Sequence, residues 1–356
     1  MLEGLGKIDW SAVEHAYGPA EDVPGLLRNL VTGNDEVRQC ALDKLYGNVF
    51  HQGTRYPATP LVVPFLIEMC SDPEVSDRPA LLELWAHLIT GYFNIQERPI
   101  WGDGELIHWH DGTAQKDLGD PISLALHDIY RESVKGHELL CRLLDNQDPD
   151  VRAYAAYVLA CLPTLTELSV PRLTARLKFE RWEKVRGAIT FALGELGAVD
   201  ELRVVMQDND FLAARSMAAC ELARIQPGDD LFEPLLSALK PPLKNVEGIP
   251  GLHDKLFSDA VYSLTLLGRE RLRDAVPAIC ELFTDANYHQ ASSLTYALLQ
   301  AAYRRTTTPL ASLDPLQRYT LRYIITAPQH WSALSLGLSQ YGLSETKEGC
   351  AALLEL

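Results

Sequence analysis

Residues 148–163 read Asp-Pro-Asp-Val-Arg-Ala-Tyr-Ala-Ala-Tyr-Val-Leu-Ala-Cys-Leu-Pro, and this stretch decides the fold class. Asp148 can accept hydrogen bonds from the free N–H groups at a helix start, and a proline suits the first helical position. Pro163 then stops the helix. Between them, five apolar residues recur at helical spacing and form one stripe: Val151, Ala155, Val158, Leu159 and Leu162. The stretch predicts an amphipathic helix that is buried along one side.

The same pattern recurs along the chain. An apolar residue or alanine precedes an arginine, a small or apolar residue follows the arginine at +3, and a leucine follows at +7. The best copies are centred on Arg38, Arg152, Arg186 and Arg215. Weaker copies begin at Arg78, Phe257 and Ala291. The steps from 152 to 186 and from 186 to 215 are 34 and 29 residues. A helical period of this size is typical of solenoids, in which stacked helix pairs share a core.

A second motif, Val-Pro followed by apolar residues, occurs at 63–64, 170–171 and 276–277. Because proline lacks the N–H that a first helical turn leaves unpaired, each Val-Pro pair predicts the first turn of a second helix. Sustained β-type alternation is absent from the sequence. We therefore expect an all-α protein, built as a right-handed α-α superhelix of seven or eight helical pairs.

We expect a single domain over residues 1–356. Residues 1–34 would form an N-terminal cap, and residues 35–305 would form the repeats, interrupted by a loop insertion over 91–121. The Val-Arg signature is lost after that, so residues 306–356 would form a C-terminal cap with helices over about 314–325, 331–340 and 345–356.

The combination of D-x-x-V-R-x-x-A-A-x-x-L with V-P-x-L-x-x-L, over roughly residues 35–305, resembles HEAT repeats of the short bacterial kind also found in phycobilin lyases. The resemblance implies that the recurring arginine pairs with an Asp of the adjacent repeat. It therefore implies a structural role for Arg38, Arg152, Arg186 and Arg215. The step of 74 residues between Arg78 and Arg152 departs from the family pattern, and the insertion falls in this step.

The charge of the chain is concentrated in its N-terminal part. Residues 1–150 contain 25 Asp and Glu against 11 Lys and Arg, a net charge of −14 out of −16 for the whole chain. Such a surface attracts basic partners and speeds their association at low salt. The alternative is an ordinary acidic surface that only keeps the protein in solution.

Cysteine usage and the apolar pattern bear on location. The seven cysteines are scattered, with no C-x-x-C pair, which favours a reducing compartment. We recognise no signal peptide at the N-terminus and no apolar run long enough to span a membrane. We therefore expect a cytoplasmic protein without membrane contact.

The insertion 91–121 is the first candidate binding element. It has no helical period, and loops longer than about 12–15 residues are usually functional or disordered. Its aromatic residues are Tyr92, Phe93, Trp101 and Trp109, and its neighbouring acids are Asp103, Glu105 and Asp111. Because tryptophan and tyrosine anchor many interfaces, we expect this loop to contact a partner. The alternatives are a loop that only covers the edge of the solenoid, or a disordered one.

Within the insertion, His108 and His110 flank Trp109 and suggest a metal site. Zinc requires three or four ligands, and no third His or Cys is near in sequence. We therefore expect neither a metal nor another cofactor, and we assign both histidines to the partner-binding set.

The second candidate is the linker around residues 46–59, which resembles the first-repeat linker of uncharacterised bacterial HEAT proteins. It contains Asn48, His51, Gln52, Arg55 and Tyr56, a mixture that suits recognition of a polar ligand or a peptide backbone. The same side chains also suit helix capping around turn glycines, and we favour capping.

Basic residues cluster once, at Arg172, Arg176, Lys178, Arg181, Lys184 and Arg186, with Trp182 among them. A nucleic-acid groove has this composition, but Glu180 and Glu183 interrupt it and the chain is strongly acidic overall. We therefore expect no nucleic-acid partner. The sequence also lacks a phosphate-binding glycine loop, a nucleophile elbow and the H-E-x-x-H metal motif.

These features predict a protein-binding repeat scaffold or regulatory factor for a basic partner, present as a monomer or weak homo-oligomer. Because similar bacterial HEAT proteins are often suspected as immunity factors, its sharpest form is neutralisation of a basic toxin. The alternative is a HEAT-like enzyme of the lyase or DNA glycosylase type, with Asp103, Glu105, His108 and His110 as candidate residues. We expect no enzymatic activity.

Overall fold

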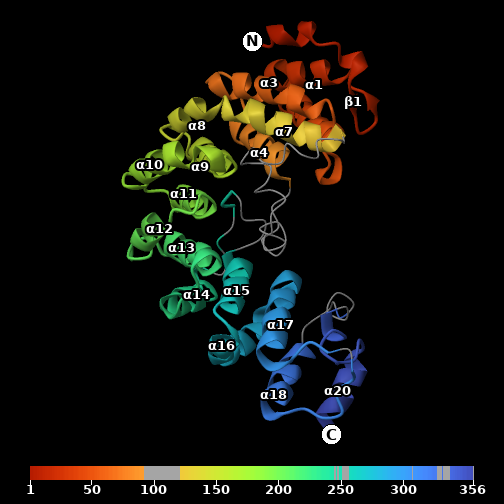
Figure 1. The fold of residues 1–356 in the computed structure, drawn as a ribbon, viewed down its shortest axis with the longest axis vertical. Coiled ribbons are helices and arrows are strands. Elements are labelled where there is room, and N and C mark those ends of the chain that lie inside the picture. The colour runs from red at the N-terminus through yellow and green to blue at the C-terminus, as the bar shows by residue number, and fades with distance from the viewer. Residues whose placement is uncertain are drawn as a thin grey trace. The chain divides into compact units, whose positions relative to one another are not determined.

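The computed structural model describes residues 1–91, 121–243, 246, 248–250, 256–306, 308–326, 331 and 337–355 (Figure 1). In these ranges, 17 α-helices provide nearly all the regular structure. The named strands of the described residues are two residues long each: β1 (Glu14–His15) and β2 (Gly18–Pro19), paired antiparallel as one hairpin. The prediction of an all-α protein is confirmed.

The chain forms two compact units. Unit 1 comprises Met1–Glu201 and Ile249–His253, and unit 2 comprises Leu202–Gly248 and Asp254–Leu356. The first boundary falls within helix α12 (Val199–Val205). One continuous domain over residues 1–356, and the superhelix that would run through it, therefore stay predictions.

Unit 1 begins with two 3-10 helices, η1 (Glu3–Lys7) and η2 (Trp10–Ala12), followed by the β1–β2 hairpin. Four helix pairs then follow: α1 (Val23–Thr32) with α2 (Asp35–Val49), α3 (Thr59–Ser71) with α4 (Arg78–Thr90), α8 (His137–Leu143) with α9 (Pro149–Ala160), and α10 (Thr166–Leu177) with α11 (Glu183–Glu195). Helix α7 (Pro121–Val134) packs on α3, and short turns form η3 (His51–Gly53) and η5 (Pro163–Leu165). Helix α9 packs between α4 and α11, so these three helices form one layer (Figure 1).

Unit 2 repeats this arrangement. Its elements are η6 (Asp229–Leu231), α13 (Leu212–Ile225), α14 (Phe232–Ala238), α15 (Leu256–Leu266), α16 (Arg269–Glu281), η8 (Leu282–Asp285), α17 (Tyr288–Ala302), α18 (Pro315–Ile324) and α20 (Lys347–Glu355). Helix α15 packs between α13 and α17, while α14 packs against α13 and α15, and α16 packs against α15 and α17. The predicted helices over 314–325 and 345–356 correspond to α18 and α20, and most of the predicted helix over 331–340 lies outside the described residues.

The start of α9 agrees with the sequence analysis. The Asp148 side chain accepts a hydrogen bond from the Asp150 N–H at 2.9 Å, and Pro149 is the first helical residue. Ala155 and Leu159 have no exposed surface. The predicted burial of Ala155 and Leu159 is therefore confirmed. The prediction of a helix buried along one side is wrong, because α9 packs against α4, α8 and α11 and is buried from Val151 to Ala160 except at the half-buried Tyr154.

The Val-Pro motifs do not mark first turns, so that prediction is wrong. Pro64, Pro171 and Pro277 lie inside α3, α10 and α16, which begin five to eight residues earlier. A proline this close to a helix start interrupts one hydrogen bond to the first turns. In α3 the burial of Val63 and Phe65 on either side of Pro64 favours the longer helix.

Two of the repeated arginines bind a carboxylate in the turn before a neighbouring helix. Arg152 of α9 binds Glu180, which precedes α11, and Arg38 of α2 binds Asp77, which precedes α4. Arg152 donates Nε to Glu180 Oε2 at 2.8 Å and Nη2 to Glu180 Oε1 at 3.1 Å. Arg38 donates Nε to Asp77 Oδ2 at 2.8 Å. Both arginines also donate to carbonyls of their own preceding turn, such as Gly33 O at 2.8 Å for Arg38. Each arginine therefore fixes two turns at once.

The other two repeated arginines also hold the turn that precedes their helix. Arg186 donates Nη1 to Leu177 O at 2.9 Å and to Glu180 O at 3.2 Å. Arg215 donates Nη1 to Asn209 Oδ1 at 2.7 Å. These contacts are structural, which agrees with the role that the sequence analysis assigned to the arginines.

Candidate partner-binding surface

Nine of the fourteen residues predicted to contact a partner lie outside the described residues: Tyr92, Phe93, Trp101, Asp103, Glu105, His108, Trp109, His110 and Asp111. The structure places the two attachment points of this insertion. One is Gly91, directly after α4, and the other is Pro121, the first residue of α7. Both points belong to unit 1.

Arg55, from the linker, closes the C-terminal end of α4. Its Nε donates to Leu88 O at 3.1 Å, its Nη2 to His87 O at 3.3 Å and its Nη1 to Gly53 O at 2.8 Å. Its guanidinium carbon also lies 5.3 Å from the centroid of the Phe50 ring. Burial lowers the pKa of Arg55 to about 10. A side chain that satisfies the last carbonyls of a helix acts as a helix cap.

Asn48 and His51 connect the end of α2 to the N-terminal hairpin. Asn48 Nδ2 donates to Asp22 Oδ2 at 2.6 Å, and the other oxygen of Asp22 lies 2.9 Å from His15 Nε2. His51 Nδ1 lies 3.2 Å from the Tyr17 hydroxyl, with the two rings edge to face at 5.4 Å. Both side chains are half-buried and already have protein partners.

Gln52 and Tyr56 complete the linker. Gln52 is exposed, and its backbone is left-handed, with φ 50° and ψ 36°. Tyr56 is half-buried, and its N–H donates to Thr59 Oγ1 at 2.8 Å at the start of α3. Gln52 is thus the one exposed residue among the five linker residues, and the others connect secondary-structure elements.

An aromatic row that the sequence analysis missed crosses the layer next to Arg55. Its members are Tyr46, Phe50, His87, Tyr157 and Phe191, from the α2 region, α4, α9 and α11. The Phe50 and His87 rings are stacked at 6.1 Å, and Tyr157 lies 6.4 Å from His87 and 5.9 Å from Phe191. The Tyr46 hydroxyl lies 3.1 Å from His87 Nδ1. One sequence signal was available, because Tyr157 and Phe191 each follow a repeat arginine at +5.

A cluster of polar side chains connects helices α4, α9 and α11. The Tyr154 hydroxyl donates to Glu83 Oε1 at 3.3 Å, and Lys184 Nζ lies 5.7 Å from the centre of the Tyr154 ring. Lys184 also donates to Asp150 Oδ1 at 2.7 Å. Burial raises the pKa of Glu83 above its ordinary value. These contacts connect α4, α9 and α11 through polar side chains.

The exposed charges of residues 1–91 are mostly carboxylates, and we call them the N-terminal acidic surface. The exposed acids are Glu3, Asp9, Glu14, Glu21, Asp22, Asp35, Glu36, Asp43, Glu74 and Asp77. Against these ten, the exposed bases of the same residues are Lys7, Arg28 and Lys44. A shallow depression on the exposed side of α2 is lined by Asp35, Glu36, Gln39, Cys40, Asp43 and Lys44. The excess of negative charge in the sequence is therefore present at the surface.

The predicted basic cluster is largely occupied by internal pairs. Arg176 binds Glu180 at 2.8 Å, as does Arg152, and Arg176 also lies 3.6 Å from Asp145. Arg186 is buried and Lys184 pairs with Asp150, as described above. Three members of the cluster are exposed: Arg172 on α10, and Lys178 and Arg181 in the turn between α10 and α11. The pairs with Asp145, Asp150 and Glu180 neutralise part of the positive charge that a phosphate backbone requires.

In the part of the chain that the structure describes, no three His, Cys, Asp or Glu side chains gather in a way that would hold a metal ion. The described helices also include none that is long and apolar enough by itself to cross a membrane. One pair, Pro149–Ala160 with Pro163–Leu177, reaches the length and composition together but is bent by 96°.

The sequence matches no protein-family model and no curated protein. Two solved structures, both of engineered proteins, match the chain. The first is 15% identical, with a TM-score of 0.34, over 94% of this chain and 98% of the other. The second is also 15% identical, with a TM-score of 0.24, over 94% of this chain and 96% of the other. Similarity at this level carries no functional argument.

Proposed function

We propose that the chain is a protein-binding scaffold or regulatory factor, with HEAT-type repeats, whose N-terminal acidic surface binds a basic partner. The observation that carries the proposal is the ratio of ten exposed acids to three exposed bases over residues 1–91. A basic protein approaching this surface is attracted over a distance of about 8–10 Å at physiological salt. The attraction raises its association rate and orients it before contact.

The insertion supplies the apolar part of the proposed interface. Trp101 and Trp109 belong to the insertion, which follows Gly91 in the sequence, and Gly91 lies one turn after His87 of the aromatic row. Tryptophan in an interface contributes more binding energy than most residues. In the proposed complex, the acidic surface thus steers the partner and the insertion holds it.

The sharpest form of the proposal is a toxin-immunity role in the cytoplasm, in which the bound partner is a basic toxin such as a nuclease. A nuclease that binds phosphate backbones carries a basic face. An acidic scaffold that covers that face would block the access of nucleic acid. This form requires a one-to-one complex that forms quickly and dissociates slowly.

The test begins with affinity purification from the native host, followed by mass spectrometry and a binding experiment with the purified partner. The first variant is Glu21→Lys/Glu36→Lys/Glu74→Lys, in which each residue is exposed and on the acidic surface. The matched control is Glu233→Lys/Glu281→Lys/Glu348→Lys, which changes the charge equally at exposed positions of unit 2. We expect the first variant to lower the association rate at least about tenfold and the control to lower it much less.

The comparison separates local from global electrostatics because both variants have the same net charge. If the two variants slow association equally, the N-terminal acidic surface has no special role and only net charge matters. If neither variant slows it, the partner is not held by charge and the proposal is wrong. Circular dichroism of each variant confirms that the helices are intact.

A further inference from the structure

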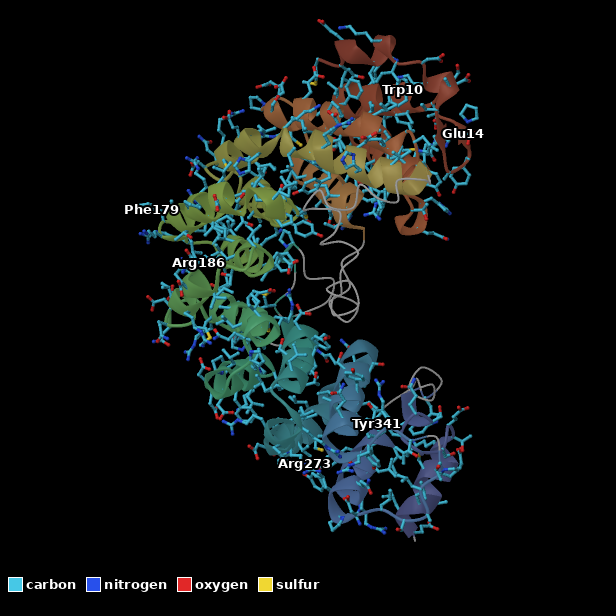
Figure 2. All side chains as sticks on the ribbon, in the orientation of Figure 1. Trp10, Glu14, Phe179, Arg186, Arg273 and Tyr341 are labelled. Carbon is cyan, nitrogen blue, oxygen red and sulfur yellow. The ribbon has the colours of Figure 1, made fainter. Side chains whose placement is uncertain are left out.

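The turn between α10 and α11 exposes two large aromatic side chains. In residues 178–182, Phe179 is 77% exposed and Trp182 is 60% exposed. Figure 2 labels Phe179 at the margin of unit 1, with Arg186 of the following helix nearby. Rings of this size are usually buried in a core or in an interface. Their exposure in one short turn indicates a contact surface.

The buried side chain of Glu180, which is 1% exposed, fixes the conformation of the turn through hydrogen bonds. The carboxylate accepts hydrogen bonds from Arg152, from Arg176 and from the backbone N–H groups of Arg181 and Trp182 at 2.9 and 3.0 Å. Arg186 Nη1 donates to the Glu180 carbonyl from the other side. A turn fixed in this way loses little conformational entropy when it binds.

The charges of the turn select an acidic partner. Lys178 and Arg181 are exposed next to the two rings, whereas the only acid of the turn, Glu180, is buried and fully engaged. The exposed part of the turn is therefore cationic and aromatic. Its complement is a surface rich in carboxylates with room for a ring between them.

We propose that this turn docks on the N-terminal acidic surface of a second copy of the same chain. The opposite charges are both present in unit 1, since residues 1–91 expose ten acids against three bases. Each chain carries a net charge of −16, which repels another copy at long range. At about 0.15 M salt the Debye length is about 8 Å, so the repulsion between distant charges is screened and the charges in direct contact determine whether two copies bind. Physiological salt therefore permits the contact.

The two surfaces involve different residues, so the contact is head-to-tail. Such a contact leaves one turn and one acidic surface free in every dimer, and the assembly grows unless it closes into a ring. Copies of the chain and the basic partner would then compete for the same acidic surface. The inference does not depend on that partner, because self-association is measured without it.

The test uses sedimentation velocity on the full chain over a hundredfold range of concentration at about 0.15 M salt. The turn variant is Phe179→Ala/Trp182→Ala and the surface variant is Glu21→Lys/Glu36→Lys/Glu74→Lys. Leu168→Ala is the control, because Leu168 on α10 is 59% exposed but lies outside the turn. We expect self-association in the parent chain and the control, with a dissociation constant at least about tenfold higher in each of the two variants.

Mixing the two variants gives the sharper result. The turn variant keeps its acidic surface, and the surface variant keeps its turn, so one intact interface remains between them. We expect a one-to-one complex that does not grow with concentration. A monomeric parent chain, unchanged association of the turn variant, or no complex in the mixture would each overturn the proposal. Helical circular dichroism of every variant excludes unfolding as the cause.

Discussion

Arg152 and Glu180 form a paired contact across 28 positions of sequence, with distances of 2.8 Å from Nε to Oε2 and 3.1 Å from Nη2 to Oε1. Arg152 belongs to α9, and Glu180 precedes α11, so the pair ties one helix of the layer to the turn that starts the next. Because Arg176 and two backbone N–H groups bind the same carboxylate, the desolvation of the buried acid is offset by many hydrogen bonds.

Glu180→Gln tests this pair. The amide keeps the shape of the side chain but removes the negative charge, so two arginine side chains lose their shared partner. We expect the free energy of unfolding to fall by about 3 kcal/mol or more, as for other broken buried pairs. Urea denaturation followed by circular dichroism measures it. Glu233→Gln, at an exposed position, is the control and should change the stability by less than about 0.5 kcal/mol.

The same pair predicts a pH dependence. Burial alone would raise the pKa of Glu180, but the hydrogen bonds from Arg152, the Trp182 N–H and Arg176 lower it from 4.5 to about 2. A group whose pKa is lower in the folded state stabilises the fold above its unfolded pKa, and the contribution is lost as pH falls through the folded value. The parent chain should therefore lose stability between about pH 5 and pH 2, by more than the Gln variant does.

Leu159→Ala tests the core of unit 1. Leu159 has no exposed surface on α9, so the change removes buried contacts and leaves a cavity. We expect it to cost about 2–5 kcal/mol of unfolding free energy. Leu168→Ala on the neighbouring α10 makes the same chemical change at a side chain that is 59% exposed, and it should cost far less. Similar losses at the two sites would contradict the burial of Leu159.

Arg55→Ala decides between a helix cap and a ligand-binding residue. Loss of the three hydrogen bonds to the His87, Leu88 and Gly53 carbonyls should lower the unfolding free energy by about 1–3 kcal/mol. Arg55→Lys should restore little of this, because a single ammonium group does not reproduce the planar fork. A variant with normal stability but weaker partner binding would instead favour recognition by Arg55.

The cysteines allow a test of burial at many positions at once. Cys40 is exposed, while Cys70, Cys141, Cys161, Cys220, Cys280 and Cys350 are buried. Burial raises the pKa of the Cys70 and Cys280 thiols to about 12, which suppresses the reactive thiolate. A thiol reagent should therefore modify one cysteine quickly in the native protein, and Cys40→Ala should abolish that phase. A second fast thiol would show that a buried site opens.

Local features of the fold could be predicted because they depend on residues close in sequence. The Asp148 cap, the first helical residue Pro149 and the burial of Leu159 each follow from a few neighbouring positions. The Val-Pro prediction was wrong because it also used only residues close in sequence. It considered only the missing N–H of Pro64. The burial of Val63 and Phe65 favours a helix that continues across the proline.

The candidate surfaces depend on contacts between distant residues. In the sequence, Glu180 is an interruption of a basic run, but in the structure it is the centre that binds Arg152 and Arg176. His87 stacks on Phe50 across 37 positions, and a single sequence does not indicate which rings will meet. Arg55 could be assigned as a cap by residue type, but its target, the end of α4, could not.

The last prediction concerns the insertion, whose binding role rests on its sequence. Trp101→Ala/Trp109→Ala should weaken partner binding by about 2 kcal/mol or more if these rings anchor the interface. Reversing Asp103, Glu105 and Asp111 to Lys should instead slow association more than it speeds dissociation, since exposed charges act mainly before contact. Stopped-flow kinetics over a range of salt concentrations separates the two rates. The tryptophan variant should keep its melting temperature, and if it unfolds at a lower temperature, the rings cover the helical repeats and do not bind a partner. Deletion of the insertion without any change in affinity would locate the interface on the helical repeats themselves.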